Sequence, residues 1–100
     1  MTGQDQEDSL DVEMRLHVAD PFPESVDKAV KYGDVEPVLI GADIYGWALM
    51  AKEGRLDHVD KARLESAADD LERSLGAFPD DARPYYERVL RIAKFALSSR

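Results

Sequence analysis

The feature that most constrains the fold is a stretch of strict alternation near the N-terminus. Between residues 10 and 18, apolar side chains alternate with charged or polar ones. Successive side chains of a β-strand point to opposite faces, so this pattern predicts an amphipathic strand. Its apolar face would carry Leu10, Val12, Met14, Leu16 and Val18. A lone strand cannot satisfy its own backbone hydrogen bonds, so the chain needs a second strand to pair with it.

Two sources of this second strand are open. We expect the strand of a second copy, which would pair with residues 10–18 across a dimer interface. The alternative is a short buried strand at residues 38–41 of the same chain, reached through a helical crossover. The first arrangement gives a mainly α fold, and the second gives an α+β fold.

Helices are expected after this strand, packed as antiparallel hairpins. Four are predicted, at about residues 24–32, 35–53, 58–76 and 81–98. Asp34 and Asp57 are placed to cap the starts of the second and third helices. Gly33 and Gly54 suit the left-handed position that ends a helix.

The predicted helix at 35–53 is apolar nearly all round, which is typical of a central helix. Ala42 and Gly46 are four residues apart on one side of it, where small side chains let a neighbouring helix approach closely. Asp43 is a charged residue within this apolar segment and shares a helical face with Trp47. A carboxylate in such surroundings needs a partner or solvent, so Asp43 and Trp47 mark a possible pocket.

Composition narrows the class of protein. The chain has 100 residues, no cysteine and a formal net charge of −8. We expect one small helical domain at residues 10–100, preceded by a disordered acidic tail at residues 1–9. Without cysteine, a disulfide framework and cysteine-based zinc sites are excluded. No secretory signal is present and no apolar stretch is long enough to cross a bilayer, so we expect a cytoplasmic protein without a membrane partner.

The sequence shows no pattern typical of catalysis or of cofactor binding. The glycines occur singly, without the spacing of a phosphate-binding loop. His17 and His58 are far apart and lack the spacing of a metal site or of a catalytic triad. We therefore expect no enzyme activity, no cofactor and no metal.

The order of predicted elements from Leu10 to Glu53 resembles that of the ribbon-helix-helix DNA-binding domains. In that family, strands from two subunits pair and enter the major groove. The outward residues of the predicted strand here are Asp11, Glu13, Arg15 and His17. Their formal charges sum to −1, where the family carries basic or amide groups, and phosphates would repel such a surface. We expect no nucleic-acid partner.

The sequence thus predicts a noncatalytic protein-interaction module that assembles through its N-terminal strand, with a second copy or with another protein. Tyr85 and Arg88 in the last helix are expected to contribute to an interaction surface. The alternative is a small transcriptional regulator, or an antitoxin-like or immunity-like inhibitor of a basic partner. The acidic net charge favours such a partner through charge complementarity.

Overall fold

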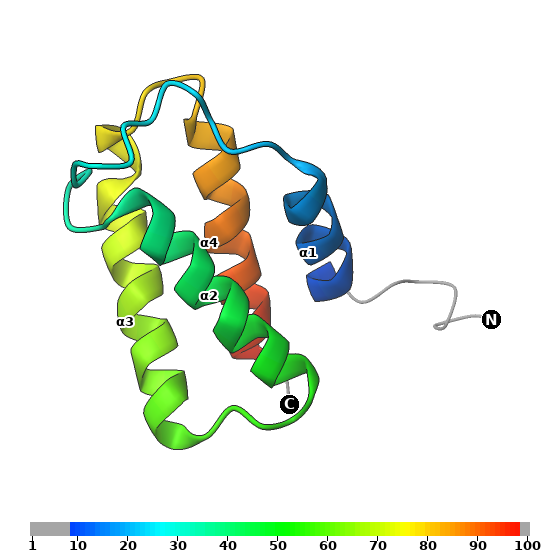
Figure 1. The fold of residues 1–100 in the computed structure, drawn as a ribbon. Coiled ribbons are helices and arrows are strands. Elements are labelled where there is room, and N and C mark those ends of the chain that lie inside the picture. The colour runs from blue at the N-terminus through cyan, green and yellow to red at the C-terminus, as the bar shows by residue number, and fades with distance from the viewer. Residues whose placement is uncertain (1–8, 99–100) are drawn as a thin grey trace.

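Helices make up nearly all of the regular structure in residues 9–98, the part of the chain that the computed structural model describes. Within these residues the elements are α1 (Ser9–Ala19), α2 (Pro37–Lys52), α3 (His58–Ser74), the 3-10 turn η2 (Leu75–Ala77) and α4 (Arg83–Ser98). Helix α4 is central, because it packs against each of the other three helices. Helices α1 and α3 lie on opposite sides of α4, and α2 crosses in front of α3 and α4 (Figure 1).

The predicted N-terminal strand is wrong, because residues 9–19 form α1. Leu10 and Met14, one helical turn apart, are buried against the rest of the molecule, with exposed fractions of 1% and 3%. Leu16 and Val18 are 45% and 69% exposed. The residues that a strand would place on one face are therefore divided between two sides of a helix.

Helix α1 carries polar residues on its buried side because α4 supplies partners for them. The guanidinium of Arg88 lies 3.2 Å from the carboxylate of Glu13. The imidazole of His17 packs against the ring of Tyr85, with ring centroids 5.0 Å apart. If only apolar residues are expected on a buried side, Glu13 and His17 are assigned to solvent. The alternating pattern then predicts a strand.

Without this strand, dimerisation by strand pairing has no structural basis, and the resemblance to ribbon-helix-helix domains fails at its first element. The alternative partner strand at residues 38–41 is also wrong, because these residues form the first turns of α2. In residues 9–98, β-type pairing is limited to an isolated antiparallel bridge between Tyr32 and Val35.

The predicted helix at residues 24–32 is wrong as well, and the segment is a series of turns. The carboxylate of Asp27 accepts a hydrogen bond from the backbone N–H of Ala29 at 2.9 Å. The carbonyl of Asp27 accepts from the N–H of Val30 at 3.4 Å. Such local bonds compete with the helical ones. Only Val26 is buried in this range, so little packing is available to hold a helix there.

The other three predicted helices are confirmed, each with bounds within two residues of those expected. Asp57 caps α3 by accepting from the N–H of Asp60 at 2.8 Å, as predicted. Gly54 ends α2 with a φ of 70°, also as predicted. Asp34 is not the cap of α2; that position is held by Glu36, whose side chain makes no capping bond.

The core lies where α2, α3 and α4 meet. Ile44, Leu64 and Leu71 are fully buried there, and Tyr86 of α4 is the largest fully buried side chain. The hydroxyl of Tyr86 donates a hydrogen bond to the carbonyl of Pro37 at 2.8 Å. Burial raises the pKa of this phenol far above its ordinary value, so it remains a donor. The first turn of α2 is thereby fixed to the first turn of α4.

The segment between α1 and α2 is anchored at the end of α3. The N–H of Asp34 donates to the buried hydroxyl of Ser74 at 2.9 Å. Gly33 has a φ of 60°, and a Cβ placed on it would lie 2.5 Å from that hydroxyl oxygen. Glycine is therefore required at this position by both backbone conformation and space.

Candidate functional site

Helix α2 presents an apolar side to solvent, which we call the α2 outer face. Val38, Leu39 and Leu49 are 45%, 53% and 42% exposed there. Ala42 and Gly46, between them, are also exposed, and a Cβ added at Gly46 would meet no atom within 4 Å. The close helix approach expected at these small residues is therefore not made within the described residues. Helix α2 is buried on one side only, rather than all round.

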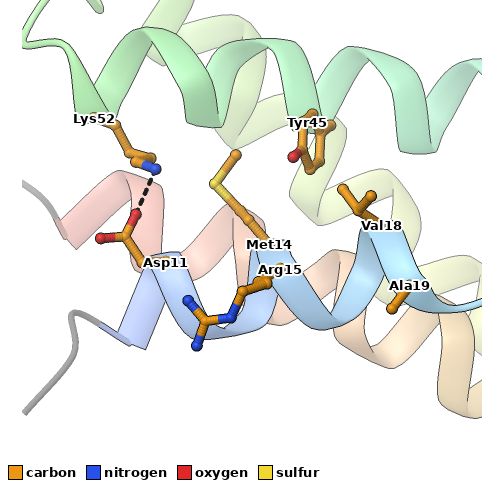
Figure 2. A pocket seen from close by; sticks show the side chains of 7 residues that line it. All are labelled: Asp11, Met14, Arg15, Val18, Ala19, Tyr45 and Lys52. Atoms are coloured by element: carbon orange, nitrogen blue, oxygen red, sulfur yellow. Dashed lines mark ion pairs between the residues drawn. The ribbon is translucent and has the colours of Figure 1, made fainter.

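A groove between α1 and α2 adjoins this face, and we call it the α1–α2 groove. Its volume is about 590 Å³. Met14 and Tyr45 project into it from the two helices, as Figure 2 shows. The ion pair between Asp11 and Lys52 lies near one end, and the exposed side chain of Val18 lies near the other.

A second groove, which we call the α2–α3 groove, contains the two residues expected to form a pocket. Asp43 and Trp47 line it from α2, together with Leu39. Arg63 and Ser66 line it from α3, and its volume is about 350 Å³. Asp43 is exposed and Trp47 is half-buried. The structure thus brings Asp43 and Trp47 together at an open surface depression.

Carboxylates border the α2–α3 groove on both sides. Asp34 and Asp70 are both paired with Arg73, which lies 3.5 Å from Asp34. Glu36 and Asp43 line the same groove, and among the described residues their carboxylates form no ion pair. Because Asp34 and Asp70 share one guanidinium, the uncompensated charge of the groove is negative. Most of it comes from Glu36 at the N-cap of α2 and from Asp43 within α2.

Arg88, expected at an interaction surface, is instead engaged within the chain. Its guanidinium lies 3.2 Å from Glu13 and 3.1 Å from Asp20, and its side chain is 24% exposed. Arg91 lies 3.4 Å from the other oxygen of Glu13. These three ion pairs hold α1 against α4.

Tyr85, the other α4 residue expected at an interface, is half-buried among aromatic rings. Its ring centroid lies 5.0 Å from that of His17 and 5.7 Å from that of Phe22. Burial, and then the charge of Asp20, raises the pKa of Tyr85. Burial lowers the pKa of His17; Asp20 opposes this shift and Arg88 adds to it. The neutral forms of both rings are therefore favoured at this contact.

The five apolar residues of the predicted strand do not form one surface. Leu10 and Met14 belong to the core, and Val12 is half-buried. Leu16 and Val18 are exposed, with Val18 at the α1–α2 groove.

The sequence interpretation missed the exposure of Val38, Leu39 and Leu49. It treated the apolar helix as central, yet α4 occupies the centre and leaves α2 on the outside. A signal was available: α4 has both a buried apolar stripe and a charged side, which suits a helix with several neighbours. A chain of this size has too few helices to cover every side of an apolar helix that packs beside α4. One apolar face of that helix is therefore left exposed.

Three or more His, Cys, Asp or Glu residues that could together hold a metal ion are not found in residues 9–98. No helix in the described part of the chain is long and apolar enough to cross a membrane. Comparison of the sequence with protein-family models, with curated proteins and with solved structures finds no match.

Proposed function

We propose that this protein is a noncatalytic protein-interaction module and that the α2 outer face is its main contact surface. The observation that carries this proposal is the exposure of Val38, Leu39 and Leu49 on one helix. Single exposed apolar residues are ordinary, but apolar side chains grouped on one face mark binding surfaces. Strand pairing forms no part of the proposal, because residues 10–18 are helical.

Helix packing is the mode of contact that this face supports best. Its large side chains are separated by Ala42 and Gly46, where the helix surface is low. A partner helix can therefore approach the α2 backbone closely and place its own side chains between Val38 and Leu49. The neighbouring α1–α2 groove offers further apolar surface beside Tyr45.

Site-specific photocrosslinking tests this function. A photoreactive residue is placed at position 38 or 49 of the full chain, and Val59 serves as the matched control. Val59 is 58% exposed but lies on α3 and is not part of the α2 outer face. We expect crosslinks to one defined protein, in extracts of the source cells, from positions 38 and 49 and not from position 59. Identical products from all three positions, or no product from any, would refute the proposal.

A second candidate function is inhibition of a basic protein. It is favoured by the net charge of −8 and by the carboxylates of Glu36 and Asp43, which form no ion pair with another described residue. In this case the partner would be held at the α2–α3 groove as well as on the α2 outer face. Loss of binding at high salt would distinguish it from a purely apolar contact.

A further inference from the structure

We infer that the α2–α3 groove binds a basic amphipathic helix of a partner protein. This inference rests on the proposed function, since it names the partner chemistry of an interaction module. It is carried by the placement, around an exposed leucine, of one tryptophan and of two carboxylates that form no ion pair with another described residue.

The two carboxylates are spaced along one side of α2. Glu36 and Asp43 are seven residues apart, which is about two helical turns and about 10 Å along the axis. Leu39 lies between them and is 53% exposed. Neither carboxylate is neutralised by an ion pair with another described residue. The groove edge therefore has the order acid, apolar, acid.

The opposite wall of the groove does not cancel this charge. Arg63 of α3 lines the groove, but its guanidinium lies 3.8 Å from Asp60 and is shared with that carboxylate. Arg73 is occupied by Asp34 and Asp70. Cationic groups of a partner are therefore attracted to the α2 edge, and anionic partners such as nucleic acids or acidic lipid surfaces are repelled.

Trp47 extends the same side of α2 by one further turn beyond Asp43. Its indole is half-buried at the groove, where it packs against the core. An aromatic face beside a carboxylate favours the ammonium of lysine or the guanidinium of arginine, through a cation–π contact combined with an ion pair.

These features together describe the ligand. A helix with two basic residues seven positions apart can reach Glu36 and Asp43 at once, because both helices have the same rise per residue. Apolar side chains on the same face, three or four positions after the first basic residue, then lie against Leu39. The groove between the consecutive helices α2 and α3 gives such a helix a place to lie.

The test uses the fluorescence of Trp47, the only tryptophan in the chain. The full-length protein is titrated with a synthetic helical peptide that has lysines at that spacing and leucines between them. A second peptide carries glutamates in place of the lysines. We expect a saturable change in Trp47 emission with the lysine peptide alone, and this change should weaken as salt is added.

Two double variants with the same change in net charge locate the binding site. Glu36→Gln with Asp43→Asn should weaken binding of the lysine peptide about tenfold, as expected for the loss of two partly exposed ion pairs. Glu65→Gln with Asp69→Asn removes two exposed carboxylates of α3 outside this groove. We expect less than about a twofold effect from this control. Circular dichroism of both variants checks that the helices are retained.

Equal weakening in the two double variants would show attraction to net charge alone and would overturn the inference. Equal binding of the lysine and glutamate peptides would overturn it too. If Trp47 emission responds to protein concentration but not to peptide, the occupant is a second copy and the inference is wrong. Crosslinks from positions 38 and 49 without peptide binding would support the proposed function and contradict only the inference that the partner is a basic helix.

Discussion

Replacing Arg88 with methionine should loosen α1 from the rest of the molecule. Methionine retains an unbranched aliphatic side chain at this position of α4 but loses the guanidinium, which lies 3.2 Å from Glu13 and 3.1 Å from Asp20. Partly exposed ion pairs contribute roughly 0.5–1 kcal/mol each, so the two together contribute about 1–2 kcal/mol. Glu13 keeps Arg91 at 3.4 Å, which limits the loss to this range.

Hydrogen exchange measured along the chain is the assay that separates α1 from the bundle. A cost of 1–2 kcal/mol corresponds to about five- to thirtyfold faster exchange of α1 amides, and α3 amides should be unaffected. Lys94→Met is the matched control, because it removes one positive charge from the same helix. Lys94 lies 3.5 Å from Glu72, and both side chains are more than half exposed. Its effect should be below about 0.5 kcal/mol.

Two results would refute this reasoning about Arg88. Equal acceleration in the Arg88→Met and Lys94→Met proteins would mean that only net charge matters. Unchanged exchange of α1 in the Arg88→Met protein would mean that apolar packing of Leu10 and Met14 alone holds the helix.

Three further predictions concern pH and stability. Burial lowers the pKa of His17 below its ordinary value of about 6.5, so the unfolded chain takes up the proton at a higher pH than the folded chain does. The free energy of unfolding, measured in urea, should therefore be highest above about pH 6.5 and fall as the pH is lowered through this value. The fall should be less steep in the His17→Gln protein. Gly33→Ala should destabilise the fold by more than about 1 kcal/mol, because its Cβ would collide with Ser74, whereas Gly46→Ala should stabilise it by about 0.5–1 kcal/mol. Thermal unfolding compares the two variants, and shifts of the same sign would contradict one of these two expectations. Tyr86→Phe should cost about 0.5–1.5 kcal/mol in urea unfolding, because it removes a buried hydrogen bond to the carbonyl of Pro37. An unchanged midpoint would show that this bond adds nothing.

The sequence was sufficient to predict the three helices whose apolar residues recur at helical spacing between capping signals. Asp57 and Gly54 act as predicted, since a cap depends on residues within one turn of it. The helix predicted at residues 24–32 is wrong because this segment lacks such apolar residues at helical spacing on a buried side. It has one buried side chain, and the local bonds of Asp27 determine its path.

The nature of α1 depended on residues far away in the sequence. Glu13 can lie on a buried side only because Arg88 and Arg91 face it, and no pattern within residues 10–18 reveals this. Asp43 and Trp47 line one groove because both lie on one side of a single helix, a relation that the helical spacing of the sequence contains. The exposure of Leu49 was not predictable in this way, because it depends on which helix occupies the centre.

The contact of α1 with α4 has a consequence for the order in which the helices fold. The ion-pair partner of α1, Arg88, lies 75 residues beyond Glu13, whereas short connections join α2 to α3 and η2 to α4. Closing such a long loop costs entropy that the contacts between consecutive helices do not incur. During synthesis α1 leaves the ribosome before the other three helices, yet the surface that receives it is completed only when α4 has emerged. We expect α1 to be the last element to join the fold, after the other three helices have assembled.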